Sequence, residues 1–489
     1  MPSAELRDFA FQANGDALRQ YAAEVLKKDP TRTAAADSLE LTAFLADCDL
    51  PGAEAKMETL KFKYQESEKI QSIISTSNLV KAHLDFAFGR FTLLEETINE
   101  ELAAFTKKVS TLESTDILQL FRLKAQKHLF LNEYVGLFEV ADLAAKFKEI
   151  GNNDQIFYLS NSISAMVFAA NGENRKALEL ANKNIKIAEL NGYKGVMAPF
   201  DSLFIQAISK TAMAAPNEAL KAFEILRSES LKYSQWPWHL MADGNFARDL
   251  AINNKLSEAL TIIREERELI SNLQLQNDLS FFPDSSELFI RYLIKDIERI
   301  ETLVNRLPNT ILVQQIRALK EEWGGKDMLE WIKNLPDTTA REKIYKLFAY
   351  SDYYADRESV AVDYMRKALV LVEETGSIEF LLRQHKIFDI IIKAANDLKT
   401  PFMEDMVRRI TDRVKQNTEN NRGELPTPLT TRELEVIRHL ATGKPISSIA
   451  ASLHVSMNTM KTHLRNIYKK LEVDGREKAV EKGRELFLI

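Results

Sequence analysis

The side chains best suited to recognition chemistry gather in a short segment near the carboxyl end, residues 458–470. The apolar residues Met460, Leu464, Ile467 and Leu471 follow one another in steps of four, three and four, which is the spacing of one face of a helix. The outer side of that helix then carries Asn458, Lys461, Thr462, Arg465 and Lys469. Cations and short hydrogen-bonding side chains on a protruding helix are what the major groove of DNA accepts.

The distribution of charge along the chain also favours DNA binding by the carboxyl-terminal segment. Residues 429–489 contain 11 Lys and Arg against 7 Asp and Glu, a balance of +4, so the formal net charge of −6 leaves −10 for residues 1–428. Because neutralisation of phosphates supplies most nonspecific affinity for nucleic acid, only the carboxyl-terminal segment is electrostatically suited to it. The acidic body therefore needs a different partner.

Two further helices are predicted before this segment. Thr430 or Thr431 caps the first, Gly443 ends it, Pro445 begins a short second helix, and Ser456 caps the third. The inward positions are Leu434, Ile437, Leu440 and Ala441 in the first helix and Ile446, Ile449, Ala450 and Leu453 in the second.

Residues 429–489 resemble the LuxR-type helix-turn-helix domain over its full length. The shared positions are Leu429, Thr430, Arg432, Glu433, Gly443, Ile449, Ala450, Leu453, Ser456, Thr459, Lys461, His463, Leu471, Arg476 and Ala479. The resemblance implies a bacterial transcriptional regulator in which Lys461, Thr462 and Arg465 read bases of double-stranded DNA. It further implies that Thr459, His463, Lys469 and the amides at the helix starts contact the DNA backbone, with RNA polymerase as a further partner.

The segment departs from the family pattern at four positions. Ile446, Ser448, Met457 and Met460 stand where the family commonly has Asn, Glu, Glu and Val. None of these changes removes a predicted cation, so we expect them to affect sequence preference more than DNA binding. A last helix, Arg476 to Phe487, offers Ala479, Val480 and residues 486–488 as an apolar edge, and in the family this element often pairs two domains, which implies a homodimer.

The remainder of the chain is predicted to be a helical solenoid. Gly and Pro number only 16 and 13 among 489 residues, and similar segments recur at a period near 40. The repeated position falls on Ala177, Ala219 and Ala259, and stepping backwards on the pair Gly136 and Leu137, the pair Glu96 and Thr97, and then Ala55 and Ala17. A helix pair of this length cannot bury its apolar stripe alone, so the pairs are expected to stack. The units loosely resemble lengthened tetratricopeptide repeats.

The predicted class is therefore all-α, in four parts. Residues 1–300 form the repeat solenoid, 301–414 further helical repeats, 415–428 a Pro-containing linker, and 429–489 the helix-turn-helix domain. The segment around Ala368 and residues 375–380 resembles the last repeats of MalT-type regulators. The large members of that family carry an NTPase, whose phosphate-binding motif this chain lacks, and the nearest string, residues 324–326, is interpreted as a turn.

Aromatic side chains suggest where an effector could bind. Tyr233, Trp236, Trp238 and Tyr353 could stack on a small molecule or hold a peptide, and the alternative is that such rings fill the cores of helix pairs. No catalytic motif and no metal-binding spacing occurs among the seven histidines and the single Cys48, so we expect neither an enzyme nor a cofactor.

Two functions are compatible with these features. The first is a cytoplasmic transcriptional regulator, with no membrane segment, whose body senses a small-molecule or protein effector and controls the DNA-binding domain. The second is a protein-interaction scaffold of helical repeats that DNA binding merely localises.

Overall fold

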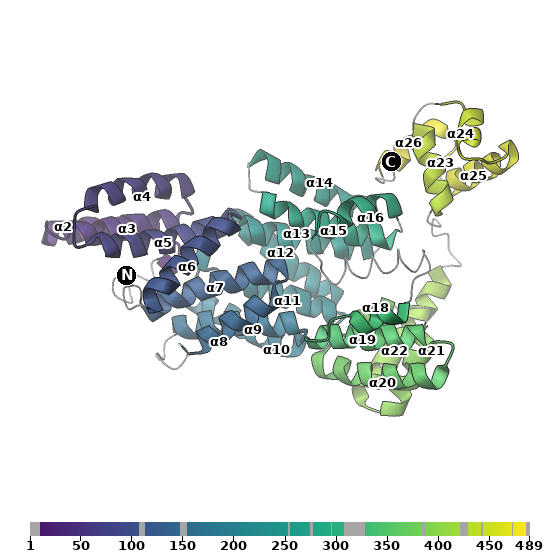
Figure 1. Cartoon of the computed structure of the whole chain (residues 1–489), viewed down its shortest axis with the longest axis horizontal. Helices are drawn as coiled ribbons and strands as arrows, with labels where there is room; N and C mark the ends of the chain where they lie inside the picture. Colours follow the sequence, from purple (N-terminus) through teal and green to yellow (C-terminus); the bar gives the residue numbers. More distant parts are fainter. Residues whose placement is uncertain are drawn as a thin grey trace. The chain divides into compact units, whose positions relative to one another are not determined.

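The computed structural model describes residues 10–106, 113–146, 154–252, 255–273, 277–294, 296–307, 328–383, 387–420, 429–441, 444–471 and 473–485. Every regular element in these ranges is a helix, which confirms the predicted all-α class (Figure 1). None of the described helices is long and apolar enough to cross a lipid bilayer. The predicted turn at 324–326 lies outside the described residues.

The chain forms two compact units. The first comprises residues 1–242, 270–280 and 329–403, and the second comprises 243–269, 281–328 and 404–489. The predicted boundary near residue 300 does not coincide with this division, because residues 329–403 pack with the amino-terminal repeats.

In the first unit, consecutive helices pack as antiparallel pairs, and α3, α5, α7, α9 and α11 each contact the next in this series. This stacking is the predicted solenoid. The bounds are α2 (Gly15–Lys28), α3 (Thr33–Ala46), α4 (Leu50–Tyr64), α5 (Ile70–Ala87), α6 (Phe91–Thr106), α7 (Ser114–Leu131), α8 (Tyr134–Ala145), α9 (Asp154–Asn171), α10 (Asn174–Asn191), α11 (Phe200–Ala212) and α12 (Pro216–Lys232), with a short 3-10 turn at Gly195–Met197. The next helix, α13 (Trp236–Ile252), begins in the first unit, and its residues 243–252 are assigned to the second.

The same tight turn closes five successive helix pairs. Its central residue has a left-handed backbone, with φ between 55° and 86°, and the next amide donates to the carbonyl five residues earlier at 2.7–2.9 Å. The left-handed residues are Cys48, Gly89, Asn132, Gly172 and Ala214. Their spacing of 40 to 43 residues confirms the period near 40 that the sequence indicates.

The residue five positions after each turn is completely buried. These residues are Ala53, Leu94, Leu137, Ala177 and Ala219, all 0% exposed. The sequence ladder is therefore correct at Ala177 and Ala219, and at the pair Gly136 and Leu137 the buried position is the second residue. The ladder falls two residues late at Glu96 and Ala55, which are exposed, although Thr97 of the predicted pair is buried. Because the period varies, a constant step drifts by two residues, and two residues turn a helix by about 200° to its opposite face.

A buried ion pair ties three repeats of the first unit together. Arg122 of α7 donates from Nε to Asp201 of α11 at 2.7 Å, and both side chains are at most 3% exposed. Gln126 and Ser162 also donate to Asp201, while Tyr158 accepts from Arg122 Nη2 at 3.3 Å. Burial raises the pKa of Asp201, but the charge of Arg122 outweighs it and holds the pKa below its ordinary value.

The later helices of the first unit pack against the turns of the repeats. Arg341 donates to the carbonyl of Ala169 at 2.8 Å, and Asn174 donates to Ser377 at 2.9 Å. Gly172 is required at this contact, because a Cβ there would lie 2.9 Å from the Arg341 side chain and φ is +86°. The bounds are α18 (Met328–Asn334), α19 (Ala340–Tyr353), α20 (Glu358–Thr375) and α21 (Phe388–Leu398), with a 3-10 turn at Leu381–Arg383.

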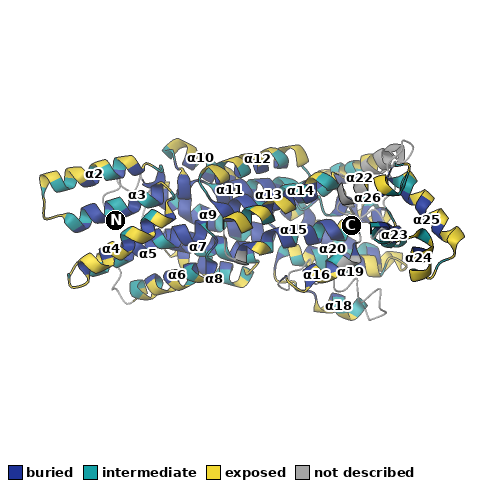
Figure 2. Cartoon of the chain, turned by 90° about the horizontal axis from the view of Figure 1, so that it is seen from above, coloured by how far each residue is buried: buried dark blue, intermediate teal, exposed yellow. Residues whose placement is uncertain are grey.

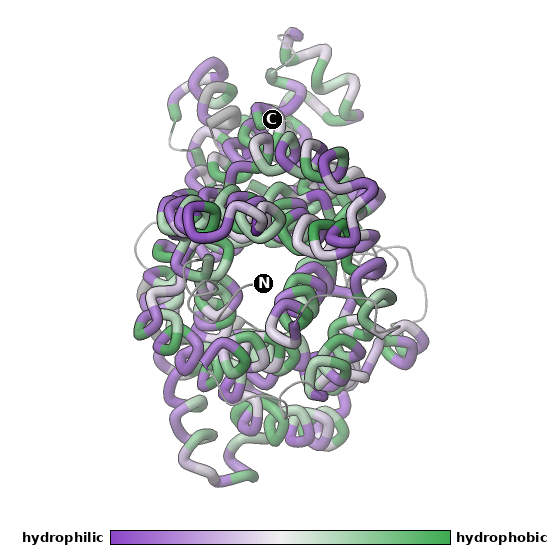
Figure 3. The backbone as a smooth tube through the Cα atoms, turned by 90° about the vertical axis from the view of Figure 1, so that its left-hand side faces the viewer, coloured by the Kyte–Doolittle hydropathy of each residue, from purple (hydrophilic) through white to green (hydrophobic). Residues whose placement is uncertain are grey.

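In the second unit, Ala259, Ile263 and Ile290 form part of one apolar core and Leu288 and Leu303 part of another. Glu287 is buried there among Arg267, Arg291 and Arg299, with nitrogen to oxygen distances of 2.7–3.1 Å. The bounds are α14 (Leu256–Asn272), α15 (Phe281–Leu293) and α16 (Ile297–Val304). Residues 270–272 of α14 and the following 3-10 turn at Asn277–Ser280 are assigned to the first unit. The burial pattern of these helices can be followed in Figure 2, and Figure 3 shows the hydropathy along the backbone of the chain.

Helix α22 (Pro401–Asn420) extends further than the sequence predicts. It continues through residues 415–420, the first part of the predicted linker, because that stretch contains neither Pro nor Gly and can propagate a helix. Residues 421–428 lie outside the described residues. The last four helices are α23 (Thr431–Ala441), α24 (Ile446–Ser452), α25 (Met457–Lys470) and α26 (Arg476–Glu485).

Candidate nucleic-acid interface

Helices α23 to α26 enclose a small core that leaves one side of α25 in solvent. Met460, Leu464, Ile467 and Leu471 are at most 8% exposed, as their spacing predicts. Ile437, Leu440, Ile449 and Ala450 pack in the same core, together with Val436, which the sequence analysis missed. The predicted end of the first helix at Gly443 lies outside the described residues. The core therefore fixes which side of α25 faces outward.

A side-chain cap begins α25. Ser456 Oγ accepts a hydrogen bond from the amide of Thr459 at 3.1 Å, which confirms the predicted cap. The Thr459 hydroxyl also lies 2.8 Å from Ser456 Oγ. Pro445 directly precedes α24, and His454 has a left-handed φ of 52° in the turn between α24 and α25. These features determine where α25 begins and how it is oriented relative to α24.

The start of α23 is joined to the end of α25. Of the two predicted caps it is Thr430 whose side chain accepts from the Glu433 amide, at 3.3 Å, while Glu433 accepts from the Thr430 amide at 2.7 Å. Glu433 also accepts from Lys470 Nζ at 2.7 Å. Burial raises the pKa of the Glu433 carboxyl, but the bonds from Lys470 and Thr430 outweigh it and lower the pKa overall.

Two arginines complete the frame by binding backbone carbonyls. Arg476 donates from Nη2 to the carbonyl of Leu440 at 2.7 Å, which satisfies a carbonyl at the end of α23. Arg432 donates to the carbonyl of Leu453 at the end of α24. Both arginines are among the positions shared with the family, but the sequence analysis assigned them no role. The structure shows that they position helices.

The three residues predicted to read bases lie together on the solvent side of α25. Lys461, Thr462 and Arg465 are all exposed, and Figure 2 shows the exposed strip along this helix. Thr462 donates its hydroxyl to the carbonyl of Asn458 at 3.1 Å, which leaves its oxygen free to accept. Of the predicted backbone contacts, Thr459 and Lys469 are exposed and His463 is half-buried.

The exposed cations of this face have no carboxylate partner among the residues that the structure describes. Neither Lys461, Arg465 nor Lys469 forms an ion pair with a described residue, whereas Lys470 and Lys478 are paired with Glu433 and Asp474. Lys444, before α24, is also exposed and has no such pair within the described ranges. The sequence analysis missed Lys444, although its position next to the predicted helix start at Pro445 was a usable signal.

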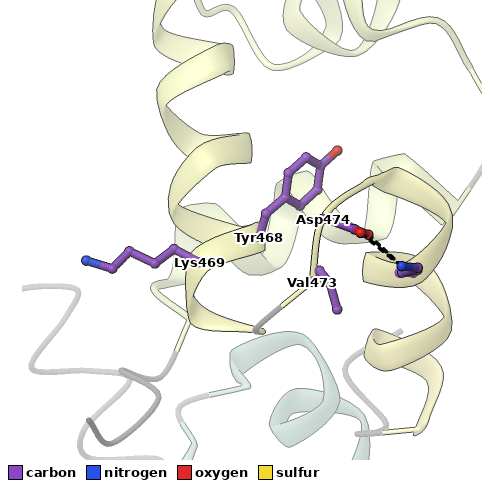
Figure 4. Close-up of a pocket in the computed structure, with 5 residues that line it drawn as sticks. Tyr468, Lys469, Val473 and Asp474 are labelled. Carbon is purple, nitrogen blue, oxygen red and sulfur yellow. Dashed lines mark hydrogen bonds and ion pairs between the residues drawn. The ribbon is translucent and has the colours of Figure 1, made fainter.

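A shallow pocket of about 340 Å³ lies between the end of α25 and the start of α26. It is lined by Tyr468, Lys469, Val473, Asp474 and Lys478. Asp474 holds Lys478 at 2.9 Å, while the Lys469 side chain extends away from that pair (Figure 4). The charge of Lys478 is thus compensated locally, and that of Lys469 is not.

The last helix, α26, directs its apolar side chains into the core of its own domain. Ala479 is completely buried in the core of its own domain, and Val480 packs against that core. The apolar edge that the sequence analysis assigned to Ala479 and Val480 is therefore already covered by α23 and α25, and residues 486–488 lie outside the described residues.

The predicted effector residues are not brought together at one surface. Trp238 is 1% exposed and packs edge-on against Phe130, with ring centroids 4.4 Å apart, and Trp236 is 9% exposed. Both tryptophan side chains therefore pack in the helical core, which is the alternative to effector binding given in the sequence analysis. Tyr233 is half-buried beneath Lys232, and Tyr353 is 41% exposed beside Tyr354. Among the described residues, no cluster of His, Cys, Asp and Glu could hold a metal ion.

Comparison with known proteins agrees with this geometry. The fold and the exposed helix define a helix-turn-helix domain at the carboxyl end of an all-α chain. The family model described as bacterial regulatory proteins, luxR family, matches residues 427–482. Residues 427–482 are therefore a LuxR-family helix-turn-helix domain.

Several bacterial regulators are similar to parts of the chain. Response regulator protein VraR of Staphylococcus saprophyticus subsp. saprophyticus is 28% identical over 186 residues, which cover 37% of this chain and 77% of that protein. Transcriptional regulatory protein LiaR of Bacillus subtilis is 33% identical over 111 residues, 22% of this chain and 51% of that protein. VraR of Staphylococcus epidermidis is 30% identical over 109 residues, 22% of this chain and 50% of that protein. The chain spans about half the length of the last two.

Proposed function

We propose that this protein is a transcriptional regulator that binds double-stranded DNA through the outer face of α25. The observation that carries the proposal is the exposed group of Lys461, Thr462 and Arg465, whose two cations have no carboxylate partner among the described residues. Lys and Arg read guanine in the major groove, and free cations gain most from neutralising phosphate. The similarity to named transcriptional and response regulators supports the same conclusion.

Lys461 and Arg465 are the base-reading residues of this proposal, and Thr462 contributes a hydrogen-bond acceptor. Thr459, His463, Lys469 and the newly recognised Lys444 contact phosphates. Because Arg432, Glu433, Lys470 and Arg476 bind inside the domain, their part is to hold α25 at its angle.

The test is the binding of the full chain to operator DNA, identified by mapping bound DNA across the genome. The double variant Lys461→Ala, Arg465→Ala is expected to lose specific binding by at least about thirtyfold, since each good base contact contributes about 1–3 kcal/mol and about 1.4 kcal/mol is tenfold in affinity. Lys478→Ala is the control, because it removes one positive charge from the same domain at a position where Asp474 already compensates that charge. Equal losses in both variants would overturn the assignment.

We further propose that the helical body senses a small-molecule or protein effector and thereby controls the DNA-binding domain. Support comes from the stacked helix pairs, which present long surfaces, and from Tyr353, the most exposed of the four predicted aromatic residues. The effector must bind two states of the protein with different affinities. A homodimer, contact with RNA polymerase, residence in the cytoplasm and a likeness of the repeats to MalT-type regulators belong to the same proposal.

The alternative function, a protein-interaction scaffold, predicts a different outcome for the same variant. Three large apolar side chains on separate helices of the first unit, Phe62, Val135 and Leu190, are at least 70% exposed, which favours contacts with other proteins. If the transcript profile of the Lys461→Ala, Arg465→Ala variant matches that of the wild type while deletion of the body changes it, the scaffold function is correct and the regulator is not.

A further inference from the structure

One exposed apolar side chain stands at the start of the proposed reading helix. Met457 is 41% exposed, which makes it the most exposed large apolar residue in the described part of this domain. The nearby Met460 is 0% exposed and belongs to the core, so the two methionines of α25 have different surroundings. Met457 is thus placed for contact with something outside the domain.

The position of Met457 relates it to the base-reading residues. It is the first residue of α25, directly after the capping Ser456, and steps of four lead from it to Lys461 and then to Arg465. Residues four apart lie next to each other along a helix surface, so Met457 extends the cationic row toward the amino end of α25. In helix-turn-helix proteins this end of the recognition helix contacts base edges.

The electrostatics of the helix start favour the same contact. The first turn of α25 contains no acidic residue, so the positive end of the helix dipole is not compensated there and no carboxylate repels phosphate. An acid at this position would stabilise the helix by itself. The helix start instead carries an exposed thioether, which offers DNA an apolar contact and no like charge.

We propose that Met457 contacts the 5-methyl group of a thymine next to the bases read by Lys461. The thymine methyl is the apolar group that base edges present in the major groove, and apolar side chains recognise it by contact. This inference rests on the proposed DNA binding by α25 and assigns one residue of sequence specificity in addition to the cations.

Deoxyuridine substitution isolates the contact, because it removes only the methyl group. The full chain is used to select its best binding sites from a random duplex library, and each thymine of the selected site is then replaced in turn by deoxyuridine. The wild type is expected to lose about fourfold in affinity at one position, from ~0.8 kcal/mol for one buried methyl-sized group. Met457→Ala is expected to bind the unmodified site about fourfold more weakly and to be insensitive at that position.

Two further variants sharpen the test. Met457→Leu is expected to keep most of the methyl sensitivity, whereas Met457→Glu, which introduces the residue that the family commonly has here, is expected to lose the methyl sensitivity without abolishing DNA binding. Leu231→Ala, which truncates an exposed apolar side chain of α12, is expected to leave DNA binding unchanged. Thermal unfolding confirms that each variant is folded, and Ala at this position is itself a good helix former.

The outcomes separate this inference from the function on which it rests. The Met457 contact is wrong, while DNA binding stands, if the wild type selects a site but replacing each thymine by deoxyuridine leaves its affinity unchanged. The same conclusion follows if Met457→Ala is as sensitive to the loss of the methyl group as the wild type. If the full chain selects no sequence and binds no duplex, both proposals are wrong.

Discussion

The dependence of DNA binding on salt concentration tests the charges of the interface one at a time. The domain presents four exposed cations without a carboxylate partner among the described residues, namely Lys444, Lys461, Arg465 and Lys469. Each phosphate neutralised on duplex DNA contributes about −0.9 to the slope of log K against log salt concentration. Lys444 and Lys469 are the two of these that are proposed to contact phosphates, so together they contribute about −1.8 to the slope for one bound domain and twice that for two domains on a two-fold site.

The perturbation is Lys469→Ala in the full chain. It removes one cation whose side chain extends away from Asp474, so the slope is expected to fall in magnitude by about 0.9 per domain, with no change in which sequence is preferred. Lys444→Ala is expected to do the same. Fluorescence anisotropy of a labelled duplex, titrated at several salt concentrations between roughly 50 and 300 mM, measures the slope.

The control is again Lys478→Ala, whose charge is already paired with Asp474 at 2.9 Å and which should leave the slope unchanged. The reasoning is refuted if Lys469→Ala leaves the slope as it was, or if Lys478→Ala lowers it equally. The second result would mean that the total charge of the domain, and not the unpaired cations of one face, sets the affinity.

Two predictions concern the stability of the body. Asp201→Ala leaves the buried Arg122 guanidinium without its carboxylate, so the free energy of unfolding of the first unit should fall by about 3–5 kcal/mol in urea titrations, and a loss below about 1 kcal/mol would contradict the role of this pair. Burial raises the pKa of Glu287, but Arg299, Arg267 and Arg291 outweigh it and lower the pKa to about 2. A lowered pKa adds stability above the ordinary pKa of about 4.5 and loses it as the pH falls toward 2, so Glu287→Gln should flatten the pH dependence of unfolding in that window, and an unchanged profile would count against the charge network.

Local sequence patterns were sufficient where one helix and its own neighbours decide the outcome. The stripe from Met460 to Leu471, the cap at Ser456 and the period near 40 all follow from spacing and side-chain chemistry, and each is confirmed. The choice between Thr430 and Thr431 as the cap of α23 required the structure, because both residues can accept the same bond and only the reciprocal contact with Glu433 distinguishes them.

Aromatic residues could not be assigned from sequence because their surroundings come from distant segments. Trp238 packs against Phe130, more than 100 residues away in the chain, and it is therefore core, while Tyr353 stands exposed at the end of α19. A ring in a solenoid looks the same in both cases when only its neighbours in sequence are known.

By itself, the sequence determined that the chain is all-α and repetitive, that it ends in a LuxR-type helix-turn-helix domain, and which side of α25 is cationic. These properties depend on period, composition and caps, which act over a few residues. Only the tertiary structure decided which cations remain unpaired, since Lys469 and Lys470 are adjacent in sequence and only Lys470 meets Glu433, 37 residues earlier. Ion pairing is settled by where helices pack, and packing joins residues that the sequence keeps far apart.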